Sequence, residues 1–394
     1  MSFANLAALP PDPMLSLIHR VSADSRDGKI DLGVGVYQDA EGRTPVFDSV
    51  KQAESALWRT QSTKAYLGAG GDTDYVERLG AEALGLGHGL RGLQTIGGTG
   101  ALRLAGELLA RGLPERRIWI GLPTWTNHEP LLRAAGLRIA HCDLADPPRG
   151  TLRHEALLDA LREAPEGDAF LVQASGHNPS GFDPDPELWQ AFADVAVARR
   201  LVPLVDLAYQ GLGSGWREDV APIAPLLERV PRLLIAYSCD KNFGLYRERV
   251  GALFFRGAND EETAGLRDHL HAIARVSYSM PSDHGAAIVR TVLDDPRLRA
   301  AWRAELAAAR DRVTAIRMAL AQRGRIGAID FAPLAAGRGL FARLPLSAAA
   351  IQRLQVEHAV YLAPSGRMNL AGLSDRNLDR FLAALEATQC RSAA

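Results

Sequence analysis

Lys241 stands between a predicted strand and the residues that begin the next one. The apolar run 233–237 predicts a buried parallel strand, and ligands of open α/β sheets bind beyond the carboxyl ends of such strands. An amine in that position, held among apolar neighbours, can lose its proton and form a Schiff base with an aldehyde. Ser238 and Arg249 flank it and have side chains that can hold a phosphate group. The segment therefore favours a phosphorylated aldehyde cofactor over the alternative of a surface lysine in a loop.

Asp206 ends the apolar run 201–205 and would direct a carboxylate to the same edge of the sheet. A carboxylate there can keep a pyridine nitrogen protonated, which turns the ring into an electron sink, although a helix N-cap is the alternative role. Tyr209, three residues later, is expected to share a helical face with Asp206 and can donate a hydrogen bond to a phenolate oxygen. Asn178, which precedes Pro179, is either a turn residue or a further ligand of that ring oxygen.

Glycines at positions 97, 98 and 100, together with Thr99, precede a helical run predicted at 101–111. Backbone N–H groups at a helix start can cradle a phosphate, and Gly98 and Thr99 are the candidates here. A plain glycine turn is the alternative interpretation. The segment is not a dinucleotide fingerprint, because the pattern Gly-x-Gly-x-x-Gly followed by an acidic residue is absent.

Four further residues have side chains suited to such a site. Trp125 can stack on a planar ring or simply belong to the core, and His128 can orient the Asp206 carboxylate or be a surface residue. Arg367 follows an apolar strand, and its planar guanidinium matches a substrate carboxylate. Arg275 closes a predicted helix, where the alternative role is to interact with the helix dipole.

Alternating strand and helix patterns from about residue 48 to 295 predict an α/β sheet covered by helices. A long helix is expected at 297–323, because apolar residues recur there every three or four positions; it would span roughly 40 Å and join two domains. The segment after it predicts a small α+β unit, and an N-terminal arm with Pro10, Pro11 and Pro13 is expected to lie extended on a partner. Strands are predicted at 117–120, 169–173, 201–205, 233–237, 251–255, 340–344 and 360–363.

The composition of the 394 residues, 47% hydrophobic and 23% charged, is that of an ordinary globular protein. A net charge of -1 without a basic cluster argues against nucleic acid as a partner. No apolar run approaches the roughly 20 residues that cross a bilayer, and no signal pattern opens the chain, so we expect no membrane and a cytoplasmic location. Three widely separated cysteines fit a reducing compartment, and the ten histidines show no metal-ligand spacing, so no metal is expected.

Taken in this order, the segments resemble the fold-type I, pyridoxal-phosphate-dependent aminotransferases of class I, in particular the aspartate and aromatic amino acid aminotransferase group. The similarity covers nearly the whole chain and includes residues 32–37, 64–68 and 98–103. The resemblance implies a large domain, 48–309, with a mostly parallel seven-stranded sheet covered by helices. It also implies a smaller α+β domain from both chain ends, 1–47 and 310–394, and a homodimer with active sites built from both chains.

The resemblance implies a role for each candidate residue. Lys241 would carry the cofactor and act as general base, Asp206 would pair with the pyridine nitrogen, and Trp125 would stack on the ring. Asn178 and Tyr209 would bind the ring hydroxyl. The phosphate would be bound by Gly98, Thr99, Ser238, Arg249 and, from the other subunit, Tyr66. Arg367 would bind the substrate α-carboxylate near Gly35, and Arg275 of the other subunit would bind a side-chain carboxylate.

The sequence departs from the family pattern at three positions. Asp240 stands just before Lys241, where the family has a small neutral residue. We expect this carboxylate to point away from the site and to be satisfied by backbone donors, because an unpaired charge beside a phosphate would be costly. Met280 and Ala65 replace asparagines of aspartate-selective members, a loss of polarity that suits an aromatic side chain.

These observations predict transamination between L-aromatic or acidic amino acids and 2-oxo acids such as 2-oxoglutarate. The alternatives within enzymes are a strict aspartate aminotransferase and a lyase or decarboxylase on the same scaffold. A ligand-sensing regulator would need a DNA-binding extension, for which the N-terminal segment is too short. A catalytically altered homologue is the remaining alternative, because of Asp240.

Overall fold

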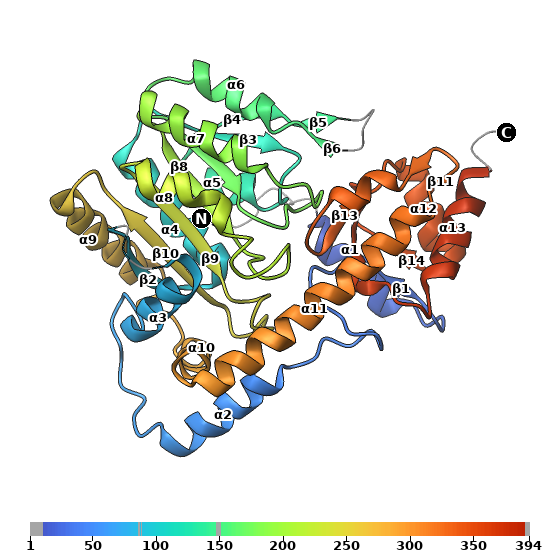
Figure 1. Ribbon diagram of the computed structural model, residues 1–394, viewed down its shortest axis with the longest axis horizontal. Coiled ribbons are helices and arrows are strands. Elements are labelled where there is room, and N and C mark those ends of the chain that lie inside the picture. Colours follow the sequence, from blue (N-terminus) through green and yellow to red (C-terminus); the bar gives the residue numbers. More distant parts are fainter. Residues whose placement is uncertain (1–10, 86, 88, 147–150, 391–394) are drawn as a thin grey trace, which may run out of the picture.

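The computed structural model describes residues 11–85, 87, 89–146 and 151–390, and its centre is a seven-stranded sheet. The strand order is β2-β10-β9-β8-β7-β3-β4 (Figure 1). Neighbouring strands are parallel, except that β10 runs antiparallel to both β2 and β9. The predicted mostly parallel sheet is therefore confirmed. The strands are β2 (Arg91–Ile96), β3 (Arg117–Leu122), β4 (Arg138–Asp143), β7 (Ala169–Gln173), β8 (Val202–Leu207), β9 (Leu233–Ser238) and β10 (Val250–Arg256).

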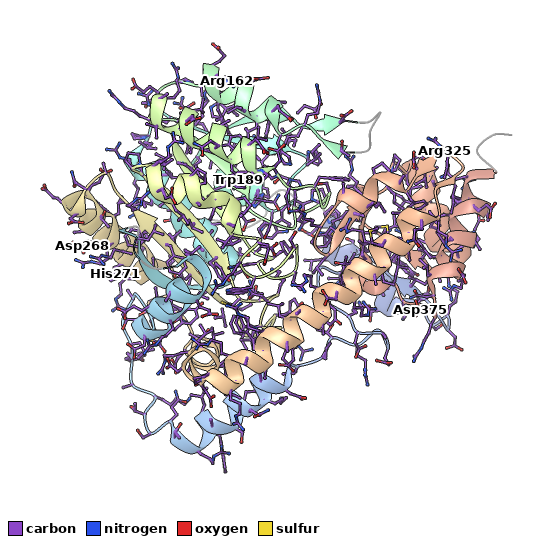
Figure 2. All side chains as sticks on the ribbon, viewed as in Figure 1. Arg162, Trp189, Asp268, His271, Arg325 and Asp375 are labelled. Atoms are coloured by element: carbon purple, nitrogen blue, oxygen red, sulfur yellow. The ribbon has the colours of Figure 1, made fainter. Side chains whose placement is uncertain are left out.

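Helices cover both faces of this sheet because its central strands are apolar on both sides. In β9, Leu233, Ile235 and Tyr237 belong to one buried cluster, whereas Leu234 and Ala236 belong to a second cluster on the opposite face. In Figure 2, Trp189 lies inside the molecule, whereas Asp268 projects from α9 into solvent. The helices of this part are α2 (Asp48–Thr60), α3 (Thr73–Leu84), α4 (Gly97–Gly112), α5 (His128–Ala134), α6 (Glu155–Glu163), α7 (Pro186–Ala198), α8 (Ala224–Arg229), α9 (Asp260–Ser277) and α10 (His284–Asp294).

The long helix α11 (Pro296–Gln322) runs from the large sheet part to a smaller unit near the C-terminus (Figure 1). Its start is capped by the Asp295 side chain, which accepts the N–H groups of residues 297 and 298. The apolar positions that predicted it are all buried: Leu298, Trp302, Leu306, Ala309, Val313, Ile316 and Leu320. The helix thus follows from its apolar periodicity.

Both chain ends contribute to the smaller unit. The short strand β1 (Ile30–Asp31) pairs in parallel with β14 (Val360–Tyr361), and β13 (Phe341–Arg343) pairs antiparallel with β15 (Arg367–Asn369). Residues 1–10 of the predicted arm lie outside the described residues, and Pro13 begins a helix rather than continuing an extended arm. The other elements are α1 (Pro13–Ala23), α12 (Ala348–His358), α13 (Leu378–Cys390), the pair β5 (Ala145–Asp146) and β6 (Thr151–Leu152), the pair β11 (Arg325–Ile326) and β12 (Ile329–Asp330), and 3₁₀ turns at Ala221–Ile223, Ala332–Ala336 and Leu370–Gly372.

Two strands of the large sheet have no counterpart among the predicted ones. They are β2 and β4, and both lie at the edges of the sheet. An edge strand has one solvent-facing side and carries more polar residues, as Arg138, His141 and Asp143 show in β4, so its apolar signal is weak. Among the described residues, no helix has the length and apolar character needed to cross a membrane.

Candidate active site

The parallel pairing brings the carboxyl ends of several strands to one edge of the sheet, and a cavity of about 240 Å³ opens there. Gln173 at the end of β7 lies beside Asp206 of β8 in the register. The cavity is lined by most of the predicted site residues, namely Gly35, Gly98, Thr99, Trp125, Asn178, Asp206, Tyr209, Ser238, Lys241 and Arg367. Residues far apart in the sequence therefore share one site.

Lys241 projects into this cavity from the turn that follows β9. Its Nζ lies 5.6 Å from the centre of the Tyr209 ring and 3.8 Å from Oδ2 of Asp240. Burial lowers the pKa of the Lys241 amine, while the carboxylates of Asp240 and Asp206 oppose that shift. A lowered pKa enlarges the share of neutral amine, which is the form that attacks a carbonyl and accepts a proton.

A chain of hydrogen bonds holds the Asp206 carboxylate in place. His128 begins α5, and its Nε2 lies 3.0 Å from Oδ2 of Asp206, while its Nδ1 lies 2.7 Å from Oγ1 of Thr124. Gln173 Nε2 in turn donates to Thr124 at 3.2 Å. His128 is fully buried, so this arrangement fixes the direction in which Asp206 faces the cavity.

Tyr209 and Asn178 form a polar pair beside Asp206. Asn178 Nδ2 donates to the Tyr209 hydroxyl at 3.4 Å, and the Asn178 N–H donates to Gln173 Oε1 at 2.9 Å. Burial raises the pKa of Tyr209, so the phenol keeps its proton and can donate it in a hydrogen bond. The expectation that Tyr209 shares a helical face with Asp206 is wrong, because Asp206 lies within β8 and Tyr209 in the turn after it. The turn still brings both side chains to the cavity.

The glycine-rich segment forms the first turn of α4 itself, whereas the sequence predicted a helix beginning at residue 101. Glycine is a poor helix former, which explains the late predicted start. A Cβ atom at Gly98 would lie 2.9 Å from Cβ of Ser238, and one at Gly97, where φ is +64°, would lie 2.6 Å from Nη2 of Arg249. Only bare backbone fits here, and N–H groups at a helix start attract anions.

The Arg249 side chain reaches the first turn of α4 from the residue before β10, the strand that pairs with β2. Because β10 is antiparallel, its first residue, Val250, pairs with Ile96 at the end of β2, directly before α4. Arg249 has a φ of +56°, a left-handed conformation that is unfavourable for a residue with a Cβ atom. Such conformations concentrate at functional sites, which agrees with a guanidinium placed beside the glycine cradle.

Asp240 faces this cavity, and the expectation that it points away is wrong. Its Oδ2 accepts a hydrogen bond from Arg249 Nη1, and the residue is only 2% exposed. Its backbone N–H donates to Ser238 Oγ at 3.2 Å, but its Oδ1 has no hydrogen-bond partner among the described residues. The physical reason is that a buried carboxylate gains more from a neighbouring guanidinium than from the protein backbone.

Arg367 also lines the cavity and is the first residue of β15. Its Nη2 donates to the Gly33 carbonyl at 2.6 Å, and its Nη1 donates to Oδ1 of Asn178 at 3.3 Å. The guanidinium carbon lies 4.9 Å from the centre of the Phe341 ring. Burial lowers the pKa of Arg367, and Nε has no partner among the described residues. This cation is thus held firmly and can still bind a carboxylate.

Three predicted residues do not line the cavity of their own chain: Arg249, which contacts the lining residue Asp240, and Tyr66 and Arg275, which lie away from it. Tyr66 is 94% exposed in the irregular segment after α2. Arg275 lies near the exposed end of α9, where its Nη1 donates to Ser279 Oγ. Neither side chain lines the cavity of its own chain.

Several lining residues were not predicted: Met14 and Ile18 of α1, Phe341 of β13, and Gln173. Gln173 ends a strand that the sequence did predict, so the rule that singled out Asp206 would have found it. The α1 residues could not be found in this way, because the prolines of that segment favoured an extended arm.

Asp183 supports the turn that carries Asn178. Its carboxylate accepts the N–H groups of Gly176, at 3.0 Å, and His177, at 2.8 Å. Burial raises the pKa of Asp183 to about 6, although these two hydrogen bonds oppose the shift. The folded state therefore retains a proton that the unfolded chain releases at lower pH.

This shift predicts a pH dependence of stability that Asp183→Asn should remove. The stabilisation is complete below the unfolded pKa of about 3.9 and is lost as the pH rises through the folded pKa. Two pKa units correspond to about 3 kcal/mol, so between pH 4 and 7 the variant should gain about that much stability relative to wild type. Urea unfolding of both proteins across this range measures the difference in their free energies of unfolding. A difference that does not change with pH would contradict the raised pKa of Asp183.

Comparison with known proteins agrees with this geometry. A family model described as aminotransferase class I and II matches residues 27–385. The chain is 48% identical over 375 residues to a tyrosine aminotransferase of Rhizobium meliloti, covering 94% of this chain and 96% of the relative. It is 44% identical over 393 residues to an aromatic-amino-acid aminotransferase of Pseudomonas aeruginosa, covering 97% and 98%. An aspartate aminotransferase of Haemophilus influenzae is 39% identical over 384 residues, covering 95% and 97%.

Among solved structures, the aromatic-amino-acid aminotransferase of Burkholderia pseudomallei, covalently bound to pyridoxal phosphate, superposes with a TM-score of 0.94. It is 34% identical, and the match covers 99% of this chain and 100% of that one. The bare backbone at Gly97 and Gly98, the half-buried Lys241 amine and the fixed Asp206 carboxylate suit the phosphate, the aldehyde and the pyridine nitrogen of this cofactor. The chain therefore belongs to the aminotransferase class I and II family, whose enzymes depend on pyridoxal 5′-phosphate.

Proposed function

We propose that this enzyme transfers the amino group between L-amino acids and 2-oxo acids, with aromatic amino acids as preferred donors and aspartate and glutamate also accepted. The observation that carries this proposal is that Lys241, Asp206 and Arg367 line one cavity. A reactive amine, a carboxylate for the pyridine nitrogen and a guanidinium for the substrate carboxylate are the groups that transamination requires. When bound, pyridoxal 5′-phosphate supplies the electron sink for the bonding electrons of the substrate α-carbon.

The residues of the chain would bind and orient the cofactor and the substrate, and one of them would move a proton. Lys241 Nζ would hold the cofactor covalently between turnovers and then accept the α-proton of the amino acid. Asp206, oriented by His128, would hold the proton on the pyridine nitrogen. Arg367 would bind the α-carboxylate near Gly35, and Trp125 would stack on the ring. Asn178 and Tyr209 would bind the ring hydroxyl, and Gly98, Thr99, Ser238 and Arg249 the phosphate.

The functional unit is proposed to be a homodimer in which Tyr66 and Arg275 complete the site of the other subunit. Tyr66 would reach the cofactor phosphate there, and Arg275 would bind a side-chain carboxylate. Large side chains near these residues are exposed in the single chain, including Trp58 at 85% and Val276 at 78%. Exposed aromatic and apolar side chains of this kind are typical of protein interfaces.

The aromatic preference rests on two positions close to these residues. Met280 and Ala65 stand where the resemblance has asparagines in aspartate-selective members. Loss of their amide groups would remove hydrogen-bond partners of an acidic side chain and leave apolar contacts for an aromatic one. The names of the tyrosine, aromatic and aspartate aminotransferase relatives agree with this mixed range.

Rates with a panel of amino acids, using 2-oxoglutarate as the acceptor, test the proposal. We expect kcat/KM for phenylalanine to exceed that for aspartate by about tenfold, a difference of roughly 1.4 kcal/mol in transition-state binding. Turnover of aspartate and glutamate alone would indicate a strict aspartate aminotransferase. Release of ammonia or carbon dioxide without an acceptor acid would indicate a lyase or decarboxylase.

We also propose a division of the chain into two domains and a location for the protein. The division into 48–309 and a unit from 1–47 and 310–394 is supported by the pairing of β1 with β14, which joins the two chain ends. A cytoplasmic location is supported by Cys142 and Cys239, which are both free thiols.

A further inference from the structure

We propose that Asp240 is a built-in anion that competes with the cofactor phosphate for Arg249, and that it thereby narrows the preference of the site for phosphorylated over unphosphorylated pyridoxal. The inference rests on the proposed function, since it concerns the same cofactor site. It assigns a role to the residue that departs from the family pattern. Its basis is the position of the carboxylate, its pairing and one unsatisfied oxygen.

Asp240 lies beside the first turn of α4, the glycine-rich turn that would bind the phosphate. Arg249 Nη1 donates to Asp240 Oδ2 and to the Tyr246 carbonyl, the latter at 3.2 Å. A Cβ atom at Gly97 would lie 2.6 Å from Arg249 Nη2 and 3.3 Å from Asp240 Oδ2. The carboxylate and the guanidinium are therefore both packed against the first turn of α4, where the phosphate would bind.

Few cations lie near Asp240 that could pair with both its carboxylate and a phosphate. The cations near it are Arg249, which is hydrogen-bonded, and Lys241, at 3.8 Å. Lys241 is the residue proposed to carry the cofactor, so Arg249 is the side-chain cation that a phosphate would have to share with Asp240. The other titratable groups whose pKa values the Asp240 charge affects are Tyr75, Cys239 and Tyr246; burial is the main cause that raises these pKa values, so the groups remain neutral. A phosphate dianion would thus have to compete with the Asp240 carboxylate, which is already hydrogen-bonded to Arg249.

The second oxygen of Asp240 could accept a hydrogen bond from unphosphorylated pyridoxal. Oδ1 is buried and has no hydrogen-bond partner among the described residues. Unphosphorylated pyridoxal carries a hydroxymethyl group where the cofactor carries its phosphate ester. That hydroxyl can donate a hydrogen bond to a carboxylate, whereas the phosphate dianion offers only acceptors. Asp240 therefore disfavours the phosphate and favours the hydroxyl at the same place.

The test compares two ligands on matched variants of the cofactor-free full-length protein. Dissociation constants of pyridoxal 5′-phosphate and of pyridoxal are measured by quenching of tryptophan fluorescence for wild type, Asp240→Ser and Asp240→Asn. Both ligands carry the same aldehyde, so the ratio of their dissociation constants isolates the phosphate, and general effects of a substitution on folding cancel. Asp240→Asn keeps the volume of the side chain and removes only its charge.

We expect the preference for the phosphorylated ligand to rise about tenfold or more in Asp240→Ser and to rise also in Asp240→Asn. Asp168→Asn is the control, because Asp168 is equally buried and paired with Arg117, but lies at the opposite end of the sheet. Its ratio should equal that of wild type. A ratio within twofold of wild type in both Asp240 variants would overturn the assignment while leaving the proposed function intact. Failure of wild type to bind pyridoxal 5′-phosphate would overturn both.

Discussion

Replacing Lys241 by alanine is expected to lower kcat by at least about 10⁴-fold while leaving the protein folded. Positioned proton transfer alone contributes up to about 10⁴-fold, and Lys241 is proposed to provide the covalent attachment as well. Its place in the cavity and its lowered pKa suit both tasks. The measurement is steady-state transamination with phenylalanine, together with the visible absorbance of lysine-bound cofactor in the purified protein.

A matched lysine serves as the control for this prediction. Lys51 is exposed on α2, where it pairs with Glu54, and Lys51→Ala should retain the wild-type rate. Unaltered absorbance of lysine-bound cofactor in Lys241→Ala would show that another lysine carries the cofactor.

Replacing Arg275 by leucine is expected to reduce kcat/KM for aspartate and glutamate by about 30-fold to several thousand-fold. Loss of one partner from a closed, hydrogen-bonded ion pair costs roughly 2–5 kcal/mol, and only acidic substrates bring a second carboxylate. The value for phenylalanine should change less than about threefold, because that substrate leaves the guanidinium unused. Equal losses for both substrate classes would mean that Arg275 is structural.

Mixed dimers test whether Arg275 acts across a subunit interface. If Lys241→Ala and Arg275→Leu subunits are refolded together, one site of each mixed dimer regains both Lys241 and a partner arginine. Random assortment would then restore roughly a quarter of the wild-type aspartate rate. If Arg275 served its own chain, the mixture would recover no aspartate activity.

The sequence predicted the central strands of the sheet because burial on both faces leaves an unmistakable apolar run, as in β9. The same rule identified Asp206 and Lys241, which follow such runs. It did not identify β2 or β4, whose sequences are more polar because these strands lie at the edges. Local composition is thus informative where burial is complete.

The orientation of individual side chains depends on tertiary contacts and was less predictable. Asp240 was expected to face away, but the guanidinium of Arg249, nine residues later, is brought beside it by the antiparallel pairing of β9 and β10. The start of α4 was placed late for a similar reason. Gly97 and Gly98 are unfavourable in an isolated helix, yet only glycine fits against Ser238 and Arg249.

The most direct test of the central claim is the half-reaction in the absence of an acceptor acid. Enzyme loaded with pyridoxal 5′-phosphate is mixed with phenylalanine, and the absorbance of lysine-bound cofactor and the products are followed in a single turnover. We expect loss of that absorbance with release of one equivalent of phenylpyruvate per subunit, no ammonia and no carbon dioxide, and recovery of the absorbance when 2-oxoglutarate is added. Release of ammonia or carbon dioxide, or no phenylpyruvate at all, would contradict it.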